Sequence, residues 1–189
     1  AGAGIADRRW SEARKRAIRD SRAGATAALC RSLAALPEPP RTLVCASAVG
    51  FYGDRGDEVL TEASAGGTDF LAGVCAEWEA AADPAREAGL RVVHARFGLV
   101  LSASGGALAR MLTPFRLGAG GRLGSGRQYM SWVDLDDAIE ALLHAIETPA
   151  VRGPMKVTGP LAVTNGGVTA TLGGGVGRAA GVPGPGFGV

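Results

Sequence analysis

A short apolar run that ends in serine constrains the fold of this chain most. Residues 42–46 show no polar alternation, which predicts a central parallel strand covered on both faces. Ser47 follows directly, and an aromatic turn flanked by glycines, Gly50-Phe51-Tyr52-Gly53, comes soon after it. Open α/β sheets bind their ligands at the carboxyl ends of such strands. We therefore expect an active-site strand end at Ser47.

Helical and extended patterns alternate along the rest of the chain. We expect Ser11, Thr68 or Asp69, and Asp134 to cap helices, and Pro84 to kink the second of these helices before Gly89 ends it. This order predicts an α/β protein with a mainly parallel sheet and flanking helices. The expected elements are helix 11–36, strand 42–46, helix 70–88, strand 90–97, helix 106–115, extended segment 128–133, helix 135–146 and strand 155–158.

Composition narrows the class of protein. The 189 residues suit one ordinary domain, and a net charge of +2 without a basic block argues against a nucleic-acid partner. The three cysteines lie far apart, without metal-ligand spacing, and are typical of reduced thiols. The sequence contains no apolar run of membrane-spanning length. We expect a cytoplasmic protein that binds a small molecule, no metal and no membrane, with homo-oligomerisation left open.

Glycine is concentrated near the C-terminus. Six glycines between residues 166 and 177 fall where a helix is expected, and each costs about 1 kcal/mol relative to alanine in a helix interior. We therefore expect an ordered domain over residues 1–165 and a degenerate, irregular tail over 166–189, with residues 184–189 disordered.

The expected helix 135–146 has apolar residues at helical spacing. Its expected buried stripe consists of Ala138, Ile139, Leu142, Leu143 and Ile146.

Six short motifs, in order over residues 1 to about 165, resemble the extended short-chain dehydrogenase/reductase family. They are closest in kind to its epimerase-like branch, the YfcH-type or SDR39U1-type epimerase family proteins. The motifs are Ala1-Gly2 with residues 5–10 (IADRRW), Ser21-Arg22, residues 47–53 (SAVGFYG), residues 78–82 (WEAAA), residues 96–101 (RFGLVL) and Ser131-Trp132.

This resemblance implies a Rossmann-like fold that binds NAD or NADP. The glycine-rich turn that holds the pyrophosphate in such folds follows a first strand, and the sequence shows no such turn. The resemblance therefore suggests a chain that lacks the first three strands of the nucleotide-binding half, with cofactor affinity severely reduced. It also implies that Ala1, Gly2 and Ile5 line the cofactor groove, and that an Asn at 165 starts a helix.

Catalysis in this superfamily uses a Tyr-x-x-x-Lys pair, in which lysine lowers the pKa of the tyrosine that acts as acid and base. Counting back from Glu79, the lysine position falls on Cys75 and the tyrosine position on Leu71. The chain has two tyrosines and two lysines, and no tyrosine is followed by a lysine at this spacing. The expected catalytic residues are therefore Ser47, Tyr52 and Cys75.

Each candidate has a structural alternative. Tyr52 also suits aromatic packing under the turn, and Cys75 needs a neighbouring cation or dipole to form a thiolate. Glu77 and Glu79 are the remaining ionisable groups beside Cys75, and surface-helix carboxylates are the favoured alternative to an acid/base role for them. Arg96 suits a cofactor contact, together with Ser47, or an ion pair with Asp134 or Asp136.

Four polar or aromatic residues near the last helix, Gln128, Tyr129, Ser131 and Trp132, are candidates to face a substrate, with core packing the alternative for Trp132.

Three functions remain open from the sequence. The first is an NAD(P)-dependent epimerase or oxidoreductase that acts on an unknown small substrate, with sugar nucleotides as one candidate class. The second is a non-catalytic NAD(P)-binding or regulatory protein on the same scaffold. The third is an inactive fragment. The sequence alone does not decide whether the chain is an enzyme.

Overall fold

The computed structural model describes residues 2–177, which fall into two compact units. Unit 1 comprises Ala1–Arg55, Val59–Arg96 and Leu142–Lys156, and unit 2 comprises Gly56–Glu58, Phe97–Ala141 and Val157–Val189. The two units are described separately below. Ala1 and the tail expected to be disordered, residues 184–189, lie outside the described residues.

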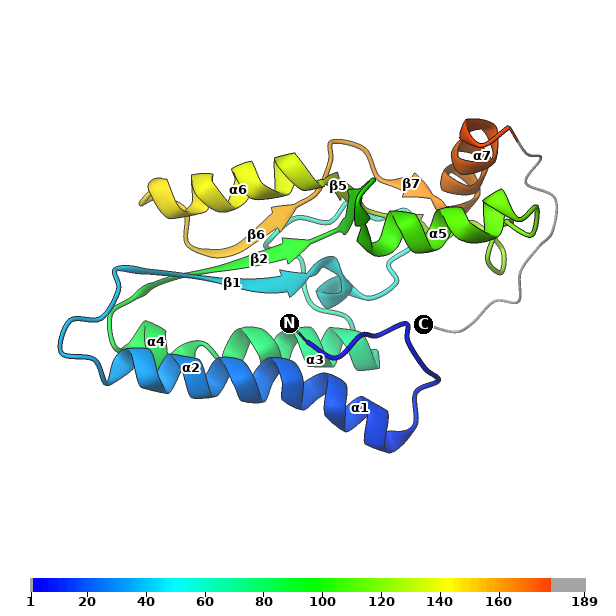
Figure 1. The fold of residues 1–189 in the computed structure, drawn as a ribbon. Coiled ribbons are helices and arrows are strands. Elements are labelled where there is room, and N and C mark those ends of the chain that lie inside the picture. The colour runs from blue at the N-terminus through cyan, green and yellow to red at the C-terminus, as the bar shows by residue number, and fades with distance from the viewer. Residues whose placement is uncertain (1, 178–189) are drawn as a thin grey trace. The chain divides into compact units, whose positions relative to one another are not determined.

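Unit 1 is built around a three-stranded sheet in the order β1-β2-β6. Figure 1 shows the arrows of β1 and β2 pointing in the same direction, with helices α2, α3 and α4 on one side of them. The described elements are α1 (Glu12–Arg19), a π-helical turn (Asp20–Gly24), α2 (Ala25–Ala34), β1 (Thr42–Ala48), a 3₁₀ turn (Val49–Tyr52), α3 (Phe70–Ala80), α4 (Asp83–Glu87), β2 (Arg91–Phe97) and β6 (Gly153–Val157).

Side-chain caps begin helices α1 and α3 as predicted. The Ser11 hydroxyl accepts a hydrogen bond from the Arg14 amide at 3.3 Å, and the Asp69 carboxylate accepts one from the Ala72 amide at 3.0 Å. The π-helical turn divides the expected helix 11–36 into α1 and α2. Pro84 lies in the first turn of α4, so the expected kink is a break between two helices.

The core of unit 1 joins helices α2 and α4 to the sheet. Its buried residues include two free thiols, Cys30 and Cys45, which face each other across the cluster. The cluster consists of Cys30, Cys45, Ala82, Ala85, Leu90 and Val92. Arg91 begins strand β2 and ties it to a later part of the chain. Its guanidinium donates to the carbonyls of Ala145 and Val151, both at 2.7 Å. Ala145 lies in the last turn of helix α6 (Leu135–Glu147), and a cation suits the negative C-terminal end of a helix.

Unit 2 contains two small strand pairs. Strands β3 (Leu99–Ser102) and β5 (Trp132–Asp134) are parallel, and β4 (Tyr129–Met130) and β7 (Val163–Thr164) are antiparallel. Helices α5 (Gly106–Arg116) and α7 (Asn165–Gly175) belong to this unit, and α6 (Leu135–Glu147) begins in it. Asp134 accepts a hydrogen bond from the Asp136 amide at 2.9 Å, consistent with its predicted role as a cap.

The predicted apolar stripe on α6 is only partly buried. Ala138 and Ala145 are buried, but Ile139, Leu143 and Ile146 are 47%, 44% and 53% exposed. The prediction is therefore wrong for these three residues. Positions 138 and 145 are two turns apart and share one face of the helix, and the small alanines occupy that packed face.

A regular helix replaces the expected irregular segment after residue 165. Helix α7 begins at Asn165, as the family resemblance implied, and the Thr164 hydroxyl accepts from the Gly167 amide at 3.2 Å. The buried Asn165 side chain accepts from the Leu123 amide at 2.8 Å. The prediction of an irregular tail is wrong for residues 166–175, because this cap and the buried Asn165 offset the weak helix propensity of glycine.

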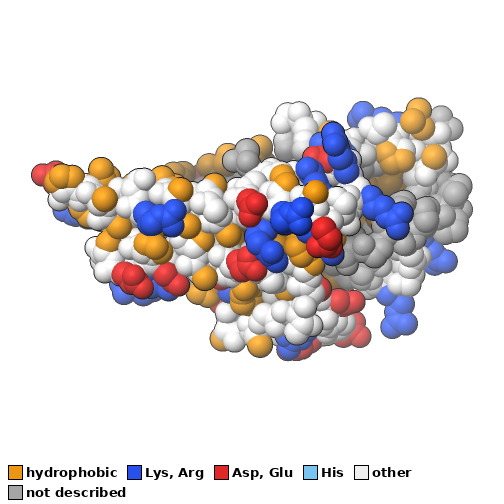
Figure 2. Space-filling view, turned by 90° about the horizontal axis from the view of Figure 1, so that it is seen from below, with side chains coloured by type: hydrophobic (Ala, Val, Ile, Leu, Met, Phe, Trp, Pro, Cys, Tyr) orange, Lys and Arg blue, Asp and Glu red, His pale blue; other side chains and the backbone are white. Residues whose placement is uncertain are grey.

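Charged side chains of both signs are interspersed on the face drawn in Figure 2. On the first helices of unit 1, Lys15 pairs with Glu12 at 3.0 Å and Arg19 pairs with Glu77 at 2.8 Å. Within residues 2–177, no helix has the length and apolar character to cross a membrane.

The glycines of α7 provide a matched pair of stability tests. Gly174 lies within the helix with open space around it, so Gly174→Ala should raise the free energy of unfolding by about 0.5 kcal/mol. Gly177 also has open space but a φ of 64°, so Gly177→Ala should lower that free energy by about 1 kcal/mol. Urea denaturation monitored by circular dichroism measures both, and equal effects of the two substitutions would contradict the assignment of α7.

Candidate functional site

Ser47 lies near the carboxyl end of β1, and its hydroxyl is held by helix α3. The residue is 3% exposed, and Oγ donates a hydrogen bond to Glu79 Oε1 at 2.7 Å. Strand alternation directs Ser47 and Cys45 to the same face of β1, and Cys45 belongs to the core cluster. The serine is therefore a fixed polar group at the end of an otherwise apolar face.

Arg96, near the end of the neighbouring strand β2, holds the same carboxylate from the other side. Its Nε donates to Glu79 Oε1 and its second terminal nitrogen to Oε2, both at 2.8 Å. The Arg96 and Glu79 side chains are 4% and 12% exposed. A bidentate geometry makes this ion pair directional as well as strong. Glu79 thus joins the ends of two neighbouring strands.

Two aromatic residues of the turn after β1 complete the surroundings of Arg96. Its remaining terminal nitrogen donates to the Tyr52 hydroxyl at 2.9 Å, and the guanidinium carbon lies 3.6 Å from the centre of the Phe51 ring. This turn is held against Gly67, whose amide donates to the Phe51 carbonyl at 2.9 Å. A Cβ on Gly67 would lie 2.7 Å from the Tyr52 carbonyl oxygen, so only glycine allows this close approach.

The electrostatics of Glu79 favour the carboxylate form. Burial alone would raise its pKa, but the hydrogen bonds from Arg96 and Ser47 and the charge of Arg96 lower the pKa below its usual value. Nearby His94 is buried, and its Nε2 lies 3.3 Å from a terminal nitrogen of Arg86. Burial lowers the pKa of His94, so this imidazole is neutral near pH 7.

Cys75 lies beneath the same strand end. Burial raises the pKa of its thiol to about 11, and the charge of Glu79 adds to this effect. The Ala48 amide, Arg22 and Arg96 act in the opposite direction but do not overcome burial. The thiol is therefore protonated at neutral pH, which removes the nucleophilic form that acid/base chemistry by Cys75 requires.

The loop before α1 is held by three side chains of α1 and the following turn. The Ala3 amide donates to Ser21 Oγ at 2.9 Å, Arg22 donates to the Ala3 carbonyl at 3.0 Å, and Arg14 donates to the Gly4 carbonyl. Ile5 remains 40% exposed, and Gly2 is exposed as well. Arg22 connects this loop to the strand end, because its charge also acts on Cys75.

The structure brings four predicted site residues into one network. Glu79 accepts a hydrogen bond from Ser47 and forms the ion pair with Arg96. Arg96 in turn donates to Tyr52, and the charges of Glu79 and Arg96 both act on Cys75. Ala1 lies outside the described residues, and Gly2 and Ile5 lie in the loop before α1.

Glu79 is the site residue that sequence reasoning missed. The sequence suggests a surface carboxylate, and it offers Asp134 and Asp136 as partners of Arg96, but the ion pair joins Arg96 to Glu79. Glu79 lies four residues after the buried Cys75, on the same helix face. That spacing was the available signal, and the identity of the partner depended on how the strand and helix pack.

The segment at residues 128–132 belongs to unit 2. Gln128 donates from its side chain to the Leu123 carbonyl at 3.0 Å, and Tyr129 is 50% exposed. The Ser131 carbonyl accepts from the Leu99 amide at 2.7 Å. Trp132 lines an apolar pocket.

The fold is that of a Rossmann-like α/β protein with a mainly parallel sheet. A crystal structure of the human epimerase family protein SDR39U1 with NADPH superposes with a TM-score of 0.88 at 35% identity, covering 97% of this chain and 63% of that one. A dTDP-glucose 4,6-dehydratase from Streptomyces venezuelae, DesIV, shares the fold with a TM-score of 0.83 at 19% identity, covering 99% of this chain and 59% of that one.

The sequence comparisons define the family more narrowly. Residues 1–157 match the model of the NAD dependent epimerase/dehydratase family, and the chain belongs to that family. The epimerase family protein Mb2239 of Mycobacterium bovis is 50% identical over 177 residues, covering 94% of this chain and 58% of the relative. The chain thus spans about three-fifths of the length of such relatives.

Two glutamates of α3 test the energetic role of the ion pair. Glu79→Gln leaves the buried Arg96 charge unpaired and should lower the free energy of unfolding by about 3 kcal/mol. Glu77→Gln removes only the half-exposed pair with Arg19 and should change it by less than about 1 kcal/mol. Denaturant titration compares both with the unsubstituted chain. Similar losses from the two variants would contradict a special role for Glu79.

The raised pKa of Cys75 predicts slow alkylation. A shift from 9.0 to about 11 leaves about 100-fold less thiolate near neutral pH than in an unshifted cysteine. Iodoacetamide labelling, resolved by peptide mass spectrometry, should therefore modify Cys75 at least that much more slowly in the folded chain than in urea. Rapid labelling of folded protein at neutral pH would instead reveal an activated thiol.

Proposed function

We propose that this chain functions as an NAD(P)-dependent epimerase or oxidoreductase that acts on a small hydroxyl-bearing substrate. Sugar nucleotides are the first substrate class to test. The observation that carries this proposal is the Ser47 hydroxyl, held at the end of β1 by Glu79 and Arg96. Enzymes often contain such buried, charge-linked polar groups where open sheets bind ligands. Homo-oligomerisation is compatible with this function.

The cofactor-binding assignment rests on exposure and preorganisation. The loop carrying Gly2 and Ile5 is exposed while Ser21 and Arg22 hold its backbone, which suits a wall for a dinucleotide. Arg96 is buried and already paired with Glu79, so it supports the site from below rather than holding the cofactor by direct ion pairing, and Ser47 is left to contact the bound ligand through its hydroxyl. When bound, the nicotinamide would supply the hydride donor or acceptor.

Ser47 and Glu79 offer a route for the substrate proton. Ser47 Oγ donates its own hydrogen to Glu79, which leaves its lone pairs to accept a hydrogen bond from a substrate hydroxyl. As that hydroxyl loses its proton to Oγ, the Ser47 proton passes to the Glu79 carboxylate. Arg96 keeps the carboxylate in place, and Tyr52 positions Arg96. Cys75 contributes a protonated thiol that packs beneath the turn.

A non-catalytic NAD(P)-binding protein is the second candidate. Its support is that Leu71 and Cys75 stand where the family resemblance places tyrosine and lysine, and that the lowered pKa of Glu79 makes this carboxylate a weak base. An inactive fragment is the remaining alternative. The three candidates differ in cofactor binding and in hydride transfer.

Cofactor titration separates the three candidates. The protein is expressed from its gene, with any residues encoded on either side of the 189, and titrated with NADPH and NADH by nicotinamide fluorescence. Deuterium transfer from [4-²H]NADPH into the 4-keto derivatives of UDP-glucose or dTDP-glucose, whose carbonyl carbon accepts the hydride, is followed by mass spectrometry. We expect binding with transfer. Binding without transfer to any substrate tested supports the second candidate, and absence of binding contradicts both.

Substitution of Ser47 sharpens this test. Ser47→Ala should lower the rate of deuterium transfer by about 100-fold or more, because the hydroxyl acts on the substrate. The affinity for the cofactor should change little. Ser32→Ala is the matched control, because Ser32 is exposed on α2 and bonds only to the Ala28 carbonyl in the structure described. Equal transfer by both variants would remove Ser47 from the mechanism.

A further inference from the structure

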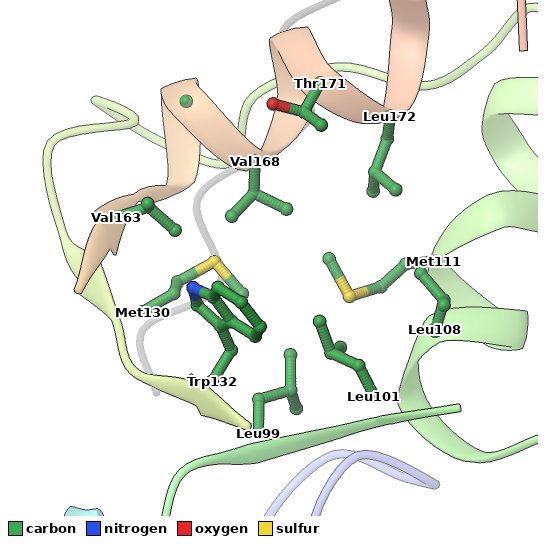
Figure 3. A pocket seen from close by; sticks show the side chains of 11 residues that line it. Leu99, Leu101, Leu108, Met111, Met130, Trp132, Val163, Val168, Thr171 and Leu172 are labelled. Carbon is green, nitrogen blue, oxygen red and sulfur yellow. The ribbon is translucent and has the colours of Figure 1, made fainter. Parts of the chain in front are cut away.

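An apolar pocket lies within unit 2, formed by both of its complete helices and by its strands. Its volume is about 290 Å³. Figure 3 shows Leu108 and Met111 of α5 facing Val168 of α7 across the pocket, with Trp132 of β5 along one wall. Within residues 2–177, the residues that line it all fall inside unit 2.

The chemistry of the walls excludes a polar ligand. Among the described lining residues, and apart from the two methionine sulfurs, only Thr171 and Trp132 bring a side chain with a hydrogen-bonding group. The sulfur of Met130 already lies 3.5 Å from the donating Asn165 side-chain nitrogen. A sugar or a phosphate bound here would lose its water without gaining partners, which is costly. The pocket therefore suits carbon-rich groups.

Size and flexibility narrow the ligand further. A dry apolar cavity of roughly 150 Å³ accommodates one benzene ring, so about 290 Å³ suits two fused rings or a branched chain of similar bulk. Met111 and Met130 are unbranched and polarizable, and such side chains adapt to flat aromatic ligands. The Trp132 ring adds an aromatic wall for stacking.

We propose that this pocket is a binding site for a small apolar molecule, or the apolar group of a larger one, about the size of two fused rings. Its described lining residues belong to unit 2, whereas Ser47 and Glu79 belong to unit 1, and the proposal does not rest on the proposed dehydrogenase chemistry. The pocket takes a ligand class different from nicotinamide cofactors and sugar nucleotides. Free apolar molecules and apolar groups on larger ligands share the chemistry that the pocket recognises.

Methionine labelling provides a direct test. The chain has three methionines, of which Met111 and Met130 line the pocket and Met155 lies in β6 of unit 1. Protein labelled with [methyl-¹³C]methionine thus gives three signals, assigned by Met→Leu substitution. Naphthalene should shift the Met111 and Met130 signals saturably and leave Met155 unchanged. UDP-glucose, as the polar comparison, should shift neither of the pocket signals.

Matched phenylalanine substitutions locate the binding. Val168→Phe should weaken naphthalene binding about tenfold or more, because the added ring fills the pocket from α7. Leu101→Phe fills it from β3 and should act in the same way. Ala170→Phe adds the same ring to an exposed position of α7 and should leave the affinity unchanged. Thermal melts establish that each variant is folded.

Several results would overturn the proposal. It fails if naphthalene leaves the Met111 and Met130 signals unchanged, or if both filling variants bind as tightly as the unsubstituted chain. It also fails if these two signals shift with protein concentration alone, since a second copy of the chain would then occupy the pocket. Deuterium transfer from NADPH is measured on the same samples. A sample that binds naphthalene but shows no deuterium transfer supports the apolar site while contradicting the proposed function, so the two can fail separately.

To test the source of the apolar group, naphthalene is compared with 1-naphthyl β-D-glucoside. Equal shifts by both indicate that the pocket accepts the apolar part of a larger ligand. Shifts by naphthalene alone indicate a site for free apolar molecules.

Discussion

The buried ion pair between Glu79 and Arg96 is the interaction on which the polar half of unit 1 depends. It connects helix α3 to strand β2, and through Ser47 it reaches strand β1. Burying two charges is expensive unless geometry and further hydrogen bonds compensate. Here the bidentate contact, Ser47, Tyr52 and the Phe51 ring supply that compensation. The position of the Ser47 hydroxyl is therefore a consequence of how a charge is accommodated.

The same network explains why the strand end is polar on one face and ordered. Gly67 lets the turn after β1 approach another backbone segment closely, which places Tyr52 and Phe51 around Arg96. Cys75 lies in this environment with two cations nearby, yet burial keeps its thiol protonated. A charged neighbour is thus insufficient to activate a cysteine when the desolvation of the thiolate is large.

Family membership indicates the fold, whereas the residues of each site select the ligand. The chain belongs to the NAD dependent epimerase/dehydratase family, and the fold alone supports many chemistries. The polar network at Ser47 and the apolar pocket of unit 2 differ in every property that selects a ligand. One offers a fixed hydroxyl and a carboxylate, and the other offers carbon, sulfur and an indole ring. A protein with both would recognise one kind of group with residues of unit 1 and another kind with residues of unit 2.

The sequence by itself determined several helix starts, the first two strands of the sheet and the residues at the strand end. The caps at Ser11 and Asp69 and the strands at β1 and β2 follow from local propensity and periodicity, which act over a few residues. Tertiary structure alone decided that Glu79 is buried and paired with Arg96, that Ile139 is exposed, and that a glycine-rich segment forms α7. These outcomes depend on which surfaces meet across long sequence separations, where packing and desolvation outweigh propensity.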